Sequence, residues 1–319
     1  MLREPAIRGK RRPRADDGLA QSSVMGRPVR WPVWATAGML AVAGLAVSAL
    51  PVAASPAGLS TQELSFRSGD LTLHGTVWSP SGSTQRLPGV VLVHGSGPGP
   101  RAAYQPEAEA FAQAGIVTLV YDKRTVGYSV LHRDYSLLAG DALAGAELLR
   151  SQPGVDPANV GLWGESEGSW VGPLAAARSA DVAFVVLVGA SGVSPIRQQA
   201  WYLGNLLRHC GVSGSMLNAV SITSLRLLAS AGLFAEPNFD TVPSLEHLHQ
   251  PVLAMWSTSD YDHPPAEASR IVQQALARGG NTHYTISFLA NASPDLHHST
   301  DGYNRLDDFA PGYIDLVTT

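Results

Sequence analysis

Six short, largely apolar runs, separated by helical segments, constrain the fold of this chain most strongly. They lie between residues 89 and 290 and read GVVLVHG, IVTLVYDKR, ANVGLWG, VAFVVLVGAS, PVLAMWS and YTISFLA. Continuous apolar runs of this length are typical of strands that are buried on both faces of a parallel sheet. The intervening segments carry apolar residues at helical spacing. This alternation predicts an α/β fold with a mainly parallel central sheet and helices on both faces.

Two further segments fix the expected organisation of this domain. Residues 63–80 alternate apolar and polar side chains around a Ser-Gly-Asp turn, which predicts a hairpin. Residues 195–245 read as helices inserted between two of the strands, where a lid over a site would lie. We therefore expect one domain over 59–319, with a short helical lid at 195–245.

The N-terminal part, residues 1–58, has a different character. A basic stretch over residues 1–30 precedes an uncharged apolar run from Trp34 to Ala54, and small residues stand at its end. This order predicts a signal peptide, and hence an exported protein of the cell envelope or the extracellular space. The alternative is an uncleaved membrane anchor, because the run is long enough to cross a bilayer.

Composition narrows the classes of partner. The net charge of -4 and the absence of a basic patch in the main domain argue against nucleic acid as a partner. No C-x-x-C or H-E-x-x-H spacing occurs, so no metal or other cofactor is expected. The single cysteine, Cys210, excludes an intramolecular disulfide, and we expect it to be a buried structural thiol.

The stretch GLWGESEGSW contains the pattern Gly164-Glu165-Ser166-Glu167-Gly168 between an expected strand and an expected helix. Glycines two residues before and after a serine suit a sharp turn in which backbone segments nearly touch. Such a turn exposes the serine hydroxyl and is known as a nucleophile elbow. A serine hydroxyl attacks only when a base takes its proton and a third group orients that base.

Candidates for the other parts follow other strands. HGSGPGPR begins at His94, and its glycine-rich turn predicts an oxyanion hole formed by the N–H groups of Ser96 and Glu167. His94 itself is expected to shape this loop. Asp260 follows the strand PVLAMWS and is the candidate acid, with Asp262 as its rival.

The candidate bases are His297 and His298, which follow the last strand. The order serine, acid, histidine along the chain favours them. A histidine pair in a loop is otherwise more often solvated, and local sequence does not choose between the two.

Five motifs in order, HGSGPGPR, YDKRTVGYS, GLWGESEGSW, PVLAMWSTSD and APGY, resemble the α/β-hydrolase superfamily over residues 62–319. The resemblance is greatest to its dienelactone-hydrolase, serine-aminopeptidase-like and esterase groups. It implies Ser166 as nucleophile and Asp260 as acid, with Ser96 and Glu167 as oxyanion donors. Asp122 and Arg124 match a structural turn of such proteins. One departure stands out, because the position of the expected histidine is Pro294.

Two functional hypotheses result. The first is a serine hydrolase that cleaves an ester, thioester or amide of a small acyl group, with His297 or His298 as base. The second is a hydrolase-fold protein that has lost catalysis and binds or senses a ligand, because proline cannot transfer a proton. Glu165 and Glu167 beside the nucleophile would favour a cationic leaving group, unless they are solvated or pair with Lys123 or Arg124.

Overall fold

The structure, a computed structural model, describes residues 58–214 and 216–319. An eight-stranded sheet runs through it in the order β1-β2-β4-β3-β5-β6-β7-β8. The strands are β1 (Leu59–Ser68), β2 (Leu71–Pro80), β3 (Leu87–Val93), β4 (Val117–Tyr121), β5 (Val155–Glu165), β6 (Val185–Val188), β7 (Val252–Ser257) and β8 (Tyr284–Leu289). The hairpin β1–β2 is antiparallel and joins β4 in antiparallel register, whereas β4, β3, β5, β6, β7 and β8 are parallel.

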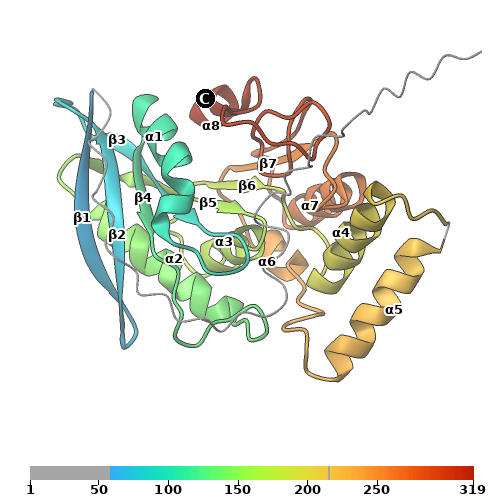
Figure 1. Ribbon diagram of the computed structural model, residues 1–319. Coiled ribbons are helices and arrows are strands. Elements are labelled where there is room, and N and C mark those ends of the chain that lie inside the picture. Colours follow the sequence, from blue (N-terminus) through green and yellow to red (C-terminus); the bar gives the residue numbers. More distant parts are fainter. Residues whose placement is uncertain (1–57, 215) are drawn as a thin grey trace, which may run out of the picture. The chain divides into compact units, whose positions relative to one another are not determined.

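Helices cover both faces of this sheet (Figure 1). One face packs against α1 (Gln105–Gln113) and α8 (Tyr313–Thr318), through Phe111 and Tyr313 among others. The other face packs against α2 (Tyr135–Arg150), α3 (Gly168–Ala176), α6 (Val242–Glu246) and α7 (Pro265–Arg278). A short 3₁₀ turn, η1 (Arg101–Tyr104), precedes α1.

The inner parallel strands are largely buried, as their continuous apolar runs predict, whereas the edge strand β8 buries only Leu289. Every residue of β4 and β6 is buried, and so are the last five residues of β3. Burial on both faces leaves such strands only their ends for polar chemistry, and ligands bind beyond the carboxyl ends of parallel strands in open α/β sheets. A ligand or catalytic site is therefore expected in the loops that follow β3, β5, β6, β7 and β8.

The insertion between β6 and β7 contains α4 (Pro195–His209), α5 (Leu217–Ser230) and α6. Helix α5 packs mainly on α4 and lies to one side of the sheet (Figure 1). Cys210 ends α4 and is exposed, so the expectation of a buried thiol is wrong. The cause is local: α4 ends there, and the chain turns outward through Gly211 before α5 begins.

The predicted strands, helices and hairpin are confirmed, and so is the α/β-hydrolase type of architecture. The predicted signal peptide or anchor falls on residues 1–57, outside the described residues. Among the helices of the described part, none combines the length and apolar character that a bilayer crossing needs.

Candidate active site

The turn around Ser166 has the geometry of a nucleophile elbow. Ser166 has a φ of 49°, in the left-handed region that a serine rarely adopts. A Cβ on Gly164 would lie 2.3 Å from the carbonyl oxygen of Gly168, and one on Gly168 would lie 2.2 Å from that of Val93. Only glycine fits either position. The turn stores strain and holds a partly exposed serine at the carboxyl end of β5.

Hydrogen bonds from neighbouring strands fix this turn. The N–H of Ser166 donates to the carbonyl of Val188 at the end of β6, at 3.0 Å. The hydroxyl of Ser169 donates to the carbonyl of Ser166 at 2.6 Å and accepts the N–H of Ser191 at 2.8 Å. The elbow is thus tied to the loop that follows β6, so the serine cannot relax into an ordinary turn.

The HGSGPGPR loop lies beside the elbow and leaves the expected donor free. Tyr104 accepts the N–H of Gly95 at 2.8 Å, and Tyr128 accepts that of Gly97 at 3.0 Å. Between them, the N–H of Ser96 has no protein acceptor among the described residues, and neither has the N–H of Glu167. Two unengaged main-chain donors beside a serine are what an oxyanion hole requires.

His94 shapes the loop, as expected from the sequence. Its Nε2 lies 2.5 Å from the carbonyl oxygen of Tyr121, and a Cβ on Gly99 would lie 2.5 Å from its Nδ1. Burial, reinforced by the charge of Lys123, lowers the pKa of His94 to about 3. A neutral imidazole in this position braces the loop and is not a base at ordinary pH.

Glu167 directs its side chain away from solvent into a buried network. Its carboxylate forms an ion pair with Lys123, accepts the hydroxyl of Tyr128 at 2.8 Å and lies 3.3 Å from Nε of Arg133. Lys123 also donates to the carbonyl of Gly95 at 2.7 Å. The carboxylate is therefore internally neutralised, and its charge does not face a substrate.

The other residues of the YDKR motif are structural. Arg124 holds the buried carboxylate of Asp141 through two nitrogens, at 2.6 and 2.5 Å. Asp122 accepts the N–H of Arg101 at 2.9 Å. The motif thus anchors the end of β4 behind the nucleophile. Lys123 is the residue of the motif that pairs with Glu167, which directly follows Ser166.

Glu165 lies on the other side of the serine and is bound by a tyrosine. Its Oε2 accepts the hydroxyl of Tyr104 at 2.6 Å. Burial raises its pKa to about 7, and the neighbouring carboxylates Asp295 and Asp262 act in the same direction. A substantial fraction of Glu165 is therefore protonated near neutral pH.

Asp260 lies in the loop after β7 and pairs with a histidine that the sequence interpretation left aside. Its Oδ1 accepts the N–H groups of Asp262 and His263 at 2.9 and 2.7 Å. Its Oδ2 lies 3.4 Å from Nδ1 of His263, and both side chains are buried. The only sign of this pair in the sequence is that His263 follows Asp260 by three residues. In a loop, this spacing does not predict that the two side chains are in contact.

The two histidines predicted as bases have other partners. His297 is fully buried, and its Nε2 lies 3.1 Å from Glu107 on α1 and 2.9 Å from Arg305. His298 lies 3.2 Å from Asp308. Within the described residues, neither imidazole contacts Ser166 or Asp260. These contacts do not fit the expectation that one of them is the base.

The reason lies in the backbone around Pro294. The N–H of Ser293 donates to the carbonyl of His297 at 2.8 Å, and that of Ser299 donates to the carbonyl of Asn291 at 2.8 Å. These bonds close a narrow loop with Pro294 near its tip. A rearrangement of the loop that brought either histidine to the serine would break these bonds.

Helix α4 braces the Asp260 loop from the side of the insertion. Trp201 donates to the carbonyl of Asp260 at 3.3 Å, Asn205 to that of Tyr261 at 3.1 Å, and Gln198 to a carboxylate oxygen of Asp262 at 3.0 Å. The carboxylate of Asp262 is thus held by α4, whereas Oδ2 of Asp260 lies 3.4 Å from Nδ1 of His263. This division favours Asp260 over its rival as the orienting acid.

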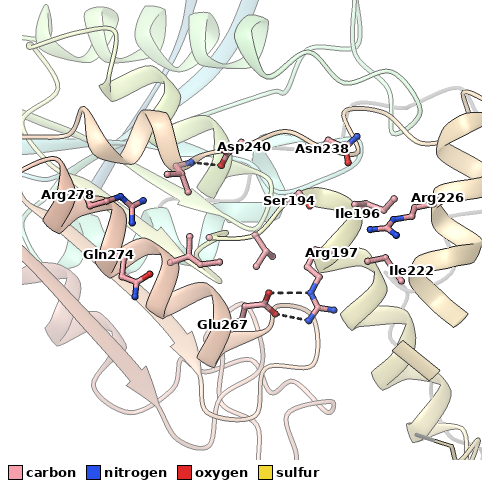
Figure 2. A pocket seen from close by; sticks show the side chains of 14 residues that line it. Ser194, Ile196, Arg197, Ile222, Arg226, Asn238, Asp240, Glu267, Gln274 and Arg278 are labelled. Atoms are coloured by element: carbon pink, nitrogen blue, oxygen red, sulfur yellow. Dashed lines mark hydrogen bonds and ion pairs between the residues drawn. The ribbon is translucent and has the colours of Figure 1, made fainter. Parts of the chain in front are cut away.

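A cavity of about 530 Å³ lies between α4, α5 and α7 (Figure 2). Arg197 and Glu267 face each other there, with one pair of atoms at 2.9 Å. Its lining does not include Ser166, Asp260 or His263, so it is separate from the elbow. In the described part of the chain, no three His, Cys, Asp or Glu side chains are grouped to hold a metal ion.

The fold and the elbow together define the class: this is a protein of the α/β-hydrolase fold. Residues 144–291 match the family model described as BAAT / acyl-CoA thioester hydrolase C terminal. The matched segment includes Ser166 and Asp260 and ends before Pro294. No curated protein matches the sequence.

Solved structures resemble this chain at low identity. A protein of Klebsiella pneumoniae described as a dienelactone hydrolase is 15% identical, with a TM-score of 0.52, over 73% of this chain and 86% of that one. The acylaminoacyl peptidase of Pyrococcus horikoshii is 20% identical, with a TM-score of 0.52, over 72% of this chain and 37% of that one. A thermostable carboxyl esterase of Bacillus coagulans is 17% identical, with a TM-score of 0.50, over 72% and 90%. At these identities the likeness shows the fold alone.

Proposed function

We propose that this protein is a serine hydrolase that cleaves an ester, thioester or amide of a small acyl group through an acyl-enzyme at Ser166. The observation that carries the proposal is the strained φ of Ser166 between two glycines that no other residue could replace. Strain of this kind persists only where the surrounding structure enforces it, and it clusters at functional sites.

The remaining parts of the site support acyl transfer. Ser166 attacks the acyl carbon, and the N–H groups of Ser96 and Glu167 receive the developing negative charge on its oxygen. An oxyanion hole of this kind contributes a large share of the rate in acyl transfer. The matched family model and the structural relatives, which include a described hydrolase, a peptidase and an esterase, support a hydrolase without selecting its substrate.

The pairing of Glu167 bears on the substrate. Because Lys123 neutralises this carboxylate, it does not select a cationic leaving group. We therefore favour esters and thioesters with uncharged leaving groups over peptide-like amines. The proposed surroundings remain those of an exported or membrane-anchored protein, on the strength of the N-terminal segment alone.

A fluorophosphonate probe tests this function, because it reacts covalently with activated serines. The folded protein and its Ser166→Ala variant are treated with the probe and mapped by mass spectrometry. Ser81→Ala, which changes an exposed serine in the turn after β2, is the matched control for site selectivity. We expect label on Ser166 alone. No label on Ser166 in folded protein would favour the second hypothesis, a hydrolase-fold binding protein without catalysis.

A further inference from the structure

We propose that His263, three residues after the acid, is the base that takes the proton of Ser166. This inference rests on the proposed function. It supplies a catalytic base in place of the histidine expected in the loop after β8, where the chain has Pro294. The triad would then run Ser166, Asp260 and His263, with acid and base in one loop after β7.

The first argument is the pairing with Asp260. The Asp260 carboxylate binds two main-chain N–H groups of its own loop through Oδ1, which leaves Oδ2 free for the imidazole. Nδ1 of His263 lies 3.4 Å from that oxygen. A base that is oriented by a carboxylate through Nδ1 presents Nε2 to the nucleophile, which is the arrangement nucleophilic catalysis by serine requires.

The second argument is the position of the ring. Gly189 has a φ of 56°, and a Cβ there would lie 2.6 Å from Cε1 and 3.2 Å from Nε2 of His263. The residue before it, Val188, accepts the N–H of Ser166. The imidazole thus lies against the backbone segment that holds the elbow, and the chain has a glycine where the ring needs the space.

The third argument is an unsatisfied atom. Both ring nitrogens of His263 are buried without a hydrogen-bond partner among the described residues, and Nδ1 has the Asp260 carboxylate at 3.4 Å. A buried polar atom without a partner costs free energy, and native structures rarely leave one without a reason. A ring nitrogen that must be free to take a proton gives such a reason, and catalytic contacts often tighten only when substrate binds.

The groups around His263 determine when it can act. Asp260 and Asp262 face it from its own loop and Glu165 from the end of β5, and these charges outweigh burial and raise its pKa to about 9. Asp295, from the loop after β8, interacts with Glu165 and Asp262. His263 is therefore mainly protonated at pH 7, and its basic form increases as the pH rises towards 9.

The chemical step balances with these groups alone. The oxygen of Ser166 forms a bond to the acyl carbon while its proton moves to Nε2 of His263. The tetrahedral intermediate then loses the leaving group, which takes that proton. Water repeats the sequence on the acyl-enzyme, so that the acid is released and both side chains return to their starting forms.

The test measures the rate at which the fluorophosphonate probe labels Ser166 between pH 6 and 10. The variants are His263→Gln, His263→Ala and the control His298→Gln, and each is compared with wild type for its unfolding midpoint. General bases contribute about 10²- to 10⁴-fold. We expect a rate that rises with pH in wild type and in His298→Gln. In His263→Gln it should fall at least about 100-fold, and the pH dependence should be lost.

Imidazole added to His263→Ala separates loss of the base from loss of the fold, because it restores labelling only if the site is intact. Partial restoration supports the proposal. Label on Ser166 at the wild-type rate in folded His263→Gln would overturn it and leave the proposed function standing. Loss of labelling in Glu165→Gln but not in His263→Gln would assign the base to Glu165. An unlabelled Ser166 in wild type would instead contradict the proposed function itself.

Discussion

Lys123 and Glu167 form a buried ion pair one residue beyond the nucleophile, and their side chains are 3% and 0% exposed. The pair also stabilises the local backbone. Lys123 also holds the carbonyl of Gly95 in the loop that supplies the proposed oxyanion donor. One lysine therefore connects the two strand ends between which the acyl oxygen would lie.

Replacement of this lysine should destabilise the protein strongly. Lys123→Met removes the charge and leaves Glu167 with Arg133, Tyr128 and the Ser96 hydroxyl, and loss of one partner from a buried ion pair costs about 3–5 kcal/mol. The free energy of unfolding, measured by denaturant titration, should fall accordingly. Arg67→Met is the matched control, because its pair with Asp70 is exposed and 3.9 Å long. Equal midpoints for both variants would contradict a structural role for the buried pair.

The second prediction concerns the glycines of the nucleophile elbow. Gly168→Ala places a Cβ 2.2 Å from the carbonyl oxygen of Val93, so the nucleophile turn must shift. We expect a loss of about 1–3 kcal/mol in stability, together with a fall in Ser166 labelling by the serine probe.

The control for this change is Gly140→Ala within α2, where a Cβ would meet only the hydroxyl of Ser68 at 4.0 Å. Helix propensity favours alanine there by up to about 1 kcal/mol. Labelling of Ser166 should be unchanged in this variant. A Gly168→Ala protein that folds and labels like wild type would show that the elbow is not constrained as described.

The pH dependence of stability gives a third prediction. Glu165 has its pKa raised from 4.5 to about 7, so between these values the folded protein keeps a proton that the unfolded chain releases. Glu165 therefore contributes a decrease in stability as the pH rises through this window, whereas His94, whose pKa is lowered from 6.5 to about 3, contributes an increase below pH 6.5. The raised pKa of His263 extends the decrease from about 6.5 to 9.

Denaturant midpoints of wild type, Glu165→Gln and Asp70→Asn from pH 4.5 to 9 check this sign. Glutamine keeps an acceptor for the Tyr104 hydroxyl but cannot ionise, so the stability of wild type relative to Glu165→Gln should fall as the pH rises from 4.5 to 7. Asp70→Asn, at an exposed turn, should follow wild type. A wild-type protein whose stability relative to Glu165→Gln rises from pH 5 to 7 would contradict the raised pKa of Glu165.

The sequence predicted those features that depend on local pattern. Buried strands read as apolar runs, and the elbow is visible because Gly164 and Gly168 must be glycine for steric reasons. The choice of histidine depends instead on tertiary contacts. Pro294 showed that the expected position of the base holds no histidine, but nothing local indicates that His297 turns towards Glu107 or that Gly189 makes room for His263.

The same limit explains two further differences. The alternatives for Glu167 were a solvent-facing charge or a pair with Lys123 or Arg124, and only the fold shows that Lys123 is the partner while Arg124 binds Asp141. The exposure of Cys210 follows from the place where α4 ends. Helix boundaries of this kind depend on packing as much as on propensity.

Helix α5 should open more readily than the rest of the domain. It buries only Ser221 and Leu225, while Val220 and Leu227 are 57% and 67% exposed. A helix with so little buried apolar surface has a low free energy of local unfolding. We expect its amides to exchange with solvent well before those of α2, and Leu225→Ala to accelerate exchange in α5 without changing exchange in α2. Leu227→Ala, which removes an exposed side chain, should leave exchange in both helices unchanged. Exchange of α5 and α2 at one common rate, in wild type and in Leu225→Ala, would mean that the insertion unfolds only with the whole domain.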